Sequence, residues 1–106
     1  MTADQARKLF LNLPCVEEKQ HHGHPDFRVN NKIFATLWPS DGRAVLRLPS
    51  AVAEQQEADR NERCRVVSRG GMGWLSVDLK FWTVMELKPL AELAHGLIPV
   101  PKKLKG

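Results

Sequence analysis

The sequence predicts an α+β domain built as a two-layer sandwich, in which an antiparallel sheet carries helices on one face. Segments with the period of amphipathic helices stand near both ends of the chain, and several segments between them alternate polar and apolar residues as strands do. Strands and helices do not alternate regularly, which argues against a parallel sheet. At 106 residues the chain fits a single domain over 1–106, and the second face of its sheet would stay at least partly open.

A helix opens the predicted fold, over Thr2–Asn12. Thr2 and Gln5 have the spacing of a capping box, in which each side chain bonds the backbone N–H of the other residue. Apolar residues follow at helical spacing, and Pro14 ends the helix because proline has no backbone N–H to donate. The polar segment Val16–His22 then predicts an exposed edge strand, whose charges oppose pairing with another chain.

The middle of the chain predicts the rest of the sheet. Asn30-Asn31 is a turn pair, since asparagine tolerates positive φ. The clearest strand patterns are Asp26–Val29, Lys32–Trp38, Arg43–Leu48 and Trp74–Lys80. Arg63–Ser68 is expected to be extended as well, and Gly70–Gly73 is expected to be a flexible turn.

Two more helices are expected. Pro49 opens a short helix that runs to about Ala58, because proline is favoured in the first turn of a helix. Thr83 and Glu86 repeat the capping-box pattern ahead of a leucine-rich stripe at helical spacing. Pro89 lies inside this stripe, so the sequence predicts either a kink or a helix that starts near Pro89.

The charge balance is basic, with 16 Lys and Arg against 12 Asp and Glu and a formal net charge of +4. The basic residues gather in two clusters, one at Arg60, Arg63, Arg65 and Arg69 and the other at Lys102, Lys103 and Lys105. A positive field raises the encounter rate with anions, including nucleic acid. The alternative interpretation is a solvated surface and a soluble tail.

The period-two pattern also predicts what the uncovered face of the sheet presents. On this face we expect Phe34, Thr36 and Trp38 from one strand, Arg43, Val45 and Arg47 from the next, and Trp74, Ser76 and Asp78 from a third. Ile33, Ala35 and Leu37 would face the helices. Aromatic rings beside arginines are the chemistry of base stacking and phosphate contact. Two alternatives stay open. The rings could be covered by the tail or a loop, and the same residue types favour protein interfaces.

Motifs of catalysis and metal binding are missing from the sequence. It contains no GxSxG, HExxH or GxxxxGK[ST] pattern, so we expect no enzyme activity and no cofactor. Consecutive histidines in His21–His24 would point to opposite faces of a strand, so we expect no native metal site. Cys15 and Cys64 lack CxxC spacing, and we expect both to be thiols packed as small apolar groups.

No apolar run approaches the roughly 18–20 residues that cross a bilayer. The first residues, Met1–Gln5, show no basic start followed by an apolar stretch, which a secretion signal would have. The expectation is therefore a cytoplasmic protein without a membrane partner, and a monomer.

A series of short motifs runs through nearly the whole chain: Leu13–Glu18, Gly23–Val29, Lys32–Leu37, Gly73-Trp74 and Pro101–Leu104. In these motifs the sequence resembles the MmcQ/YjbR-like family of small bacterial proteins. The resemblance implies a frataxin-like (CyaY-like) α+β fold, and most members have no known function. A DNA-binding role has been proposed for the family from its hairpin wings. The iron handling that a frataxin-like fold suggests is not expected, because the first helix offers no carboxylate cluster.

These observations lead to three hypotheses. The first is a non-enzymatic, mainly electrostatic nucleic-acid-binding module, with DNA as partner. Its contacts would be Arg63, Arg65 and Arg69 to phosphates, Lys32 at a hairpin tip, Arg43 and Arg47 on the open face, and Trp38 and Trp74 stacking on bases. The second is a protein-interaction or regulatory domain that uses the exposed sheet face. The third is an enzyme or small-ligand protein, which requires a well-formed pocket with convergent polar groups.

Overall fold

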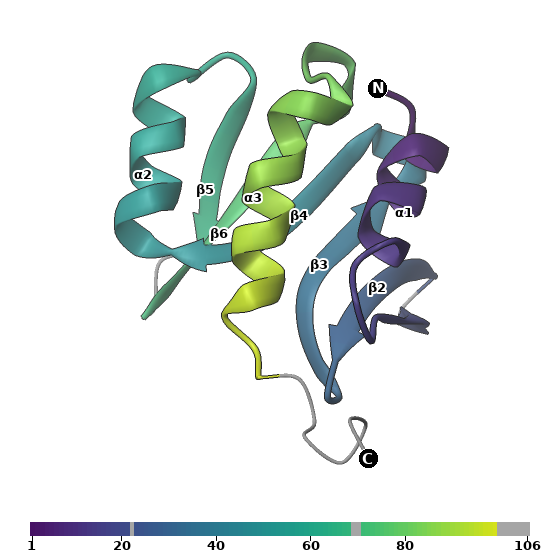
Figure 1. The fold of residues 1–106 in the computed structure, drawn as a ribbon. Helices are drawn as coiled ribbons and strands as arrows, with labels where there is room; N and C mark the ends of the chain where they lie inside the picture. The colour runs from purple at the N-terminus through teal and green to yellow at the C-terminus, as the bar shows by residue number, and fades with distance from the viewer. Residues whose placement is uncertain (22, 69–70, 100–106) are drawn as a thin grey trace.

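The computed structural model describes residues 1–21, 23–68 and 71–99, and its elements are labelled in Figure 1. The helices are α1 (Ala3–Leu11), α2 (Ser50–Asp59) and α3 (Val84–Gly96). The strands are β1 (Glu17–His21), β2 (His24–Val29), β3 (Lys32–Trp38), β4 (Arg43–Pro49), β5 (Cys64–Ser68) and β6 (Met72–Asp78). Single 3-10 turns follow β3 at Pro39–Asp41 and β6 at Leu79–Phe81.

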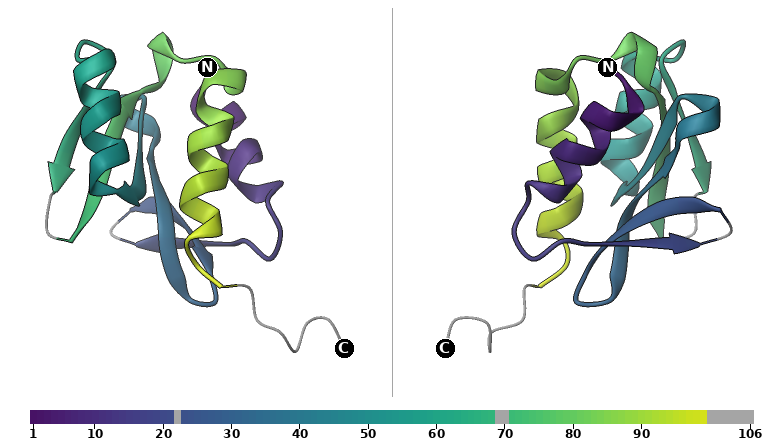
Figure 2. Two further views of the ribbon diagram at one scale, coloured as in Figure 1. Left: turned by 60° about the vertical axis from the view of Figure 1, so that its left-hand side comes forward. Right: turned by 90° about the vertical axis from the view of Figure 1, so that its right-hand side faces the viewer.

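These strands form one six-stranded antiparallel sheet in the order β1-β2-β3-β4-β6-β5. The three helices lie on the same side of it, as the turned views in Figure 2 show. Between the layers is a core in which Phe10 of α1 and Leu87 of α3 meet Phe27, Leu46 and Leu75 of the sheet, all fully buried. The predicted two-layer α+β sandwich with helices on one face is therefore confirmed.

Local signals in the sequence set several element boundaries. The N-cap Thr2 accepts a hydrogen bond from the Gln5 N–H while the Gln5 side chain accepts one from the Thr2 N–H, so the predicted capping box is present. Asn30 and Asn31 have φ angles of 51° and 63° and form the turn between β2 and β3. The charged strand β1 lies at one edge of the sheet, as predicted.

The kink at Pro89 stays a prediction, whereas the alternative, that the last helix starts near Pro89, is wrong. It begins at Val84, immediately after a second capping box between Thr83 and Glu86, and Pro89 lies inside it. The missing proline N–H leaves one helical hydrogen bond unmade, whereas Leu87 and neighbouring apolar residues of this helix are buried against the sheet. Burial along the whole helix outweighs the local loss at one peptide unit.

The Gly-rich turn and the last strand also differ from expectation. Strand β6 starts at Met72, so Gly73 is a buried strand residue and not part of a turn, while residues 69 and 70 lie outside the described part of the chain. The strand ends at Asp78, and Lys80 belongs to the following 3-10 turn. Gly73 permits close packing of α2, since a Cβ there would lie 2.6 Å from the Cβ of Ala53.

The orientation predicted for the first half of β3 is wrong, because the pairing of β2 with β3 contains a bulge. Phe27 pairs with Ala35 and Arg28 pairs with Ile33, so Phe34 is an extra residue in β3. Each bulge residue reverses the alternation that follows it along the strand. Phe34 is therefore fully buried beside Phe10, with ring centroids 6.1 Å apart, and Ile33 faces the other side.

Candidate functional site

The candidate site is the face of the sheet that the helices leave uncovered, here called the open face. On β4 and β6 its residues alternate with buried core residues, as the sequence predicts. From β2 to β5 the residues on this side of the sheet are His24, Asp26, Arg28, Ile33, Thr36, Trp38, Arg43, Val45, Arg47, Trp74, Ser76, Asp78, Arg65 and Ser68. Of these, Asp26 and Ser76 are buried beneath their neighbours. Basic and aromatic side chains from five strands therefore share one surface.

Trp74 lies near the start of β6, at one end of the open face. Arg47 is its direct partner on β4, and Ser68 is its partner on β5. A shallow groove runs from Trp74 across the sheet toward the β2–β3 turn, and it is lined by Arg28, Asn31, Lys32, Ile33, Arg47 and Trp74. The bulge in β3 puts Ile33 into this groove, which the sequence pattern did not predict.

Two arginines of the open face are held by acidic or polar partners. Arg28 donates from Nε and Nη2 to the two carboxylate oxygens of Asp26, at 2.8 and 3.1 Å, and Asp26 is fully buried. This hydrogen-bonded pair raises the pKa of Arg28. Arg43 donates to the Ser76 hydroxyl at 2.7 Å and to the Ser76 carbonyl at 3.3 Å, and its guanidinium lies 3.8 Å from Asp78. The charges of these two arginines are thus compensated within the protein.

Other cations on or beside the open face differ in this respect. Arg47 and Arg65 lie on the open face, whereas Lys32 lines the groove from the start of β3, where it pairs with the buried Val29. The side chains of Lys32, Arg47 and Arg65 form no hydrogen bond or ion pair with any other residue that the structure describes. Lys32 and Arg65 are exposed and Arg47 is half-buried. Lys19 of β1 pairs with Asp26, is exposed, and likewise has no such partner among the described residues. These groups are available to an anion, because binding would not first break an internal ion pair.

Trp38 lies at the other end of the open face, in a different environment. One side of its ring stacks on His24, with centroids 3.7 Å apart, and its Nε1 donates to the Thr36 hydroxyl at 3.1 Å. The side chain remains 39% exposed. Trp38 and Trp74 therefore share the face, but Trp38 already has a stacking partner.

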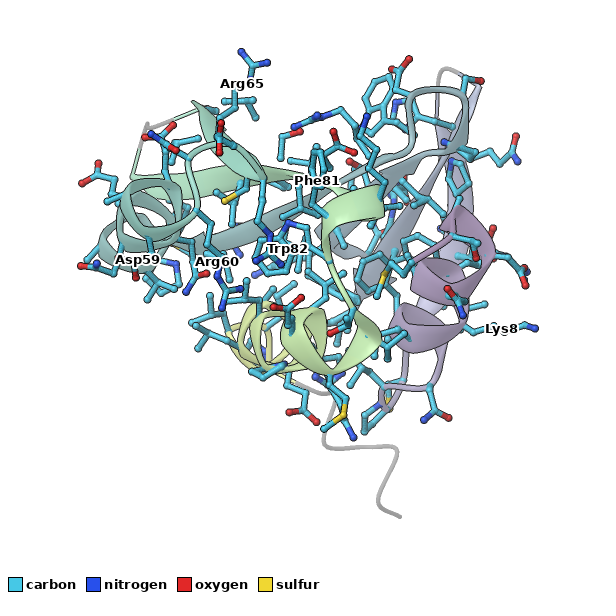
Figure 3. The ribbon with its side chains drawn as sticks, turned by 90° about the horizontal axis from the view of Figure 1, so that it is seen from above. Lys8, Asp59, Arg60, Arg65, Phe81 and Trp82 are labelled. Carbon is cyan, nitrogen blue, oxygen red and sulfur yellow. The ribbon has the colours of Figure 1, made fainter. Side chains whose placement is uncertain are left out.

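Arg63 lines one pocket with Arg43, Arg65 and Asp78 of the open face, but its guanidinium group is held elsewhere. Its guanidinium carbon lies 5.0 Å from the ring centroid of Trp82, and its Nη2 donates to Glu86 of α3 at 2.8 Å. Arg60 approaches the same ring at 4.8 Å. In Figure 3 Arg60 lies against Trp82, whereas Arg65 extends outward from the molecule. The basic cluster of the sequence is thus divided in space, and its fourth member, Arg69, lies outside the described residues, as do the lysines near the C-terminus.

Possible metal ligands and nucleophiles are dispersed. Over the described ranges no group of three or more His, Cys, Asp or Glu side chains is placed to hold a metal ion, and His22 and the His21 side chain lie outside those ranges. Cys64 is buried, and burial raises the pKa of its thiol. Cys15 is exposed in a turn with φ 61°, so its expected apolar packing is wrong. None of the helices described is long and apolar enough to cross a membrane.

Sequence reasoning also missed the Asp26–Arg28 pair. The available signal was their spacing, because residues two apart on a strand share a face. Two opposite charges at that spacing therefore predict an ion pair, although not that Asp26 would be fully buried.

Comparison with known proteins gives one match. A family model described as YjbR matches residues 11–97, which include all six strands and the helices α2 and α3, whereas α1 lies before the match except for Leu11. Neither the curated proteins nor the solved structures contain a match. The frataxin-like fold implied by the resemblance therefore stays a prediction.

Proposed function

The chain belongs to the YjbR family, and from its open face we propose that it is a non-enzymatic nucleic-acid-binding module that contacts DNA. The observation that carries the proposal is the set of Lys32, Arg47 and Arg65 around Trp74, with no acidic partner among the described residues. Cations of this kind can bind phosphates without losing an internal ion pair. The net charge of +4 adds a long-range attraction for polyanions.

The proposal fixes how binding should depend on salt. A protein that neutralises Z phosphates on duplex DNA releases the condensed counterions, so log affinity falls with log salt at a slope of about −0.9Z. If Lys32, Arg47 and Arg65 each contact one phosphate, the slope should be about −3. The arginines held by Asp26, Ser76 and Asp78 should add little, since their charges are already compensated.

The test is the fluorescence anisotropy of labelled duplex and single-stranded oligonucleotides, titrated with protein at several salt concentrations. Arg47→Gln should weaken binding and make the slope shallower by about one unit. Lys88→Gln is the matched control, because Lys88 is an exposed cation on α3, in the helix layer, and its loss lowers the net charge equally. Equal effects of the two substitutions, or no binding at low salt, would refute the proposal.

A protein partner on the same face is the second candidate function. Trp and Arg are enriched at protein interfaces, and Trp38, at 39% exposure, is accessible there. This function predicts a partner that is captured by the wild type and lost on Trp74→Ala. It also predicts no steep dependence of DNA binding on salt, and the anisotropy titration therefore separates the two functions.

A further inference from the structure

We propose that the groove beside Trp74 takes an unpaired base, so that the module prefers single-stranded nucleic acid to duplex. This inference rests on the proposed function and adds the form of the nucleic acid. It follows from three features of the open face: the environment of each tryptophan ring, the position of the uncompensated cations, and the side of the sheet on which the helices lie.

The three tryptophans of the chain have different surroundings. Trp82 is 2% exposed, and the guanidinium carbons of Arg60 and Arg63 lie 4.8 and 5.0 Å from its ring centroid. Trp38 stacks on His24 at 3.7 Å. Trp74 makes no stacking or cation–π contact with another residue that the structure describes, and it is only half-buried. Trp74 is therefore the tryptophan whose ring has neither a stacking partner nor a cation against it among the described residues, and this ring is available to a planar ligand.

Uncompensated cations stand on both sides of this ring. Arg47 is one strand away, at the register position directly opposite Trp74. Lys32 lies across the groove on β3, roughly two strand spacings or 10 Å from β6. Arg65 is on the opposite side, on β5, where it pairs with Ser76. A base stacked on Trp74 would thus have cations available to the phosphates that precede and follow it along the strand.

Stacking of this kind requires an unpaired base. The faces of duplex bases are covered by their neighbours in the helical stack, so an aromatic side chain reaches them only in single strands or after unstacking. A helix that could enter the major groove would have to project from the binding surface. In this fold all three helices pack on the opposite side of the sheet (Figures 1 and 2).

The experiment compares a labelled oligothymidine with a duplex of the same length at one low salt concentration, using the full chain. The single strand should bind at least tenfold more tightly than the duplex. Trp74→Ala should lower the affinity for the single strand by about 5- to 150-fold, the range measured for loss of one base–aromatic stack. Trp74→Phe, which keeps a ring, should retain most of the affinity, and circular dichroism checks that each variant is folded.

Tryptophan fluorescence supplies an independent readout and a matched control. Oligothymidine should quench the emission of the wild type and of Trp38→Phe, and the quenching should disappear in Trp74→Phe. Equal or tighter binding of the duplex, or quenching that survives in Trp74→Phe, would overturn this inference while leaving the proposed function in place. Failure to bind either oligonucleotide would overturn both.

Discussion

Substitution of Gly73 tests how closely the helix α2 approaches the sheet. A Cβ at Gly73 would lie 2.6 Å from the Cβ of Ala53 and 3.3 Å from the Cα of Ser50. The first distance is far inside van der Waals contact, so in Gly73→Ala the helix must move away from β6. Forcing a methyl group into a packed core costs about 1–3 kcal/mol. We expect Gly73→Ala to lose that much unfolding free energy.

A second substitution separates the clash from other effects. Ala53→Gly alone should cost about 1 kcal/mol from the lower helix propensity of glycine, and about 0.8 kcal/mol more from the lost methyl burial. In the double variant the new methyl group of residue 73 occupies the space vacated at residue 53, which conserves volume. The double variant should therefore be less destabilised than the sum of the two single variants, by at least about 1 kcal/mol.

The assay is urea unfolding followed by circular dichroism, with the slope m checked for constancy among the four proteins. The 3.3 Å contact with Ser50 remains in the double variant, so full recovery is not expected. Additive losses would mean that the methyl groups of residues 73 and 53 do not compete for the same space. A neutral Gly73→Ala would refute the close approach itself.

Two further predictions concern the titratable groups of the fold. The hydrogen bond that the Glu86 carboxylate accepts from the Thr83 N–H lowers the pKa of Glu86, and Arg63 lowers it further. The ionised Glu86 side chain therefore stabilises the fold above the unfolded pKa of about 4.3. This stabilisation is lost as the pH falls through the lower pKa of the folded state. Glutamine at position 86 can still accept the capping-box hydrogen bond, so Glu86→Gln removes only the charge. The free energy of unfolding of this variant, measured with urea, should be lower than that of the wild type at about pH 5, and the difference should shrink toward about pH 3. A difference that does not change with pH would contradict this prediction. At pH 8 Ellman's reagent should modify only Cys15, since Cys64 is buried and burial raises the pKa of its thiol. In Cys15→Ser, rapid modification without denaturant would be inconsistent with the buried thiol.

Patterns that depend on neighbours in the sequence predicted most of the fold. The two capping boxes, the Asn30-Asn31 turn and the alternation along β4 and β6 are all determined within a few residues. The open face and its tryptophans followed from that alternation. Of the two alternatives at Pro89, the one in which α3 starts there was wrong, because the free energy of burying the apolar face of the whole helix cannot be estimated from a single residue.

The composition of the candidate site was less predictable, because it depends on contacts between distant segments. Arg63 and Arg65 are neighbours in one basic cluster of the sequence, yet only Arg63 meets Trp82 and Glu86. Likewise, the partners of Arg43 lie on β6, more than 30 residues away. A count of charges in the sequence therefore does not show which basic side chains lack an acidic or polar partner, because those partners come from distant segments of the chain.

The bulge at Phe34 determines which residues of β3 lie on the open face. Ile33 and Trp38 are an odd number of positions apart, so a regular strand would turn them to opposite sides of the sheet. The extra residue acts as a phase shift that lets one strand supply both ends of the open face. In a related chain, one residue inserted or deleted between these positions would move the residues on one side of it from the open face to the core face, and the reverse, although the composition would hardly change. Strand length is thus itself part of what specifies this surface.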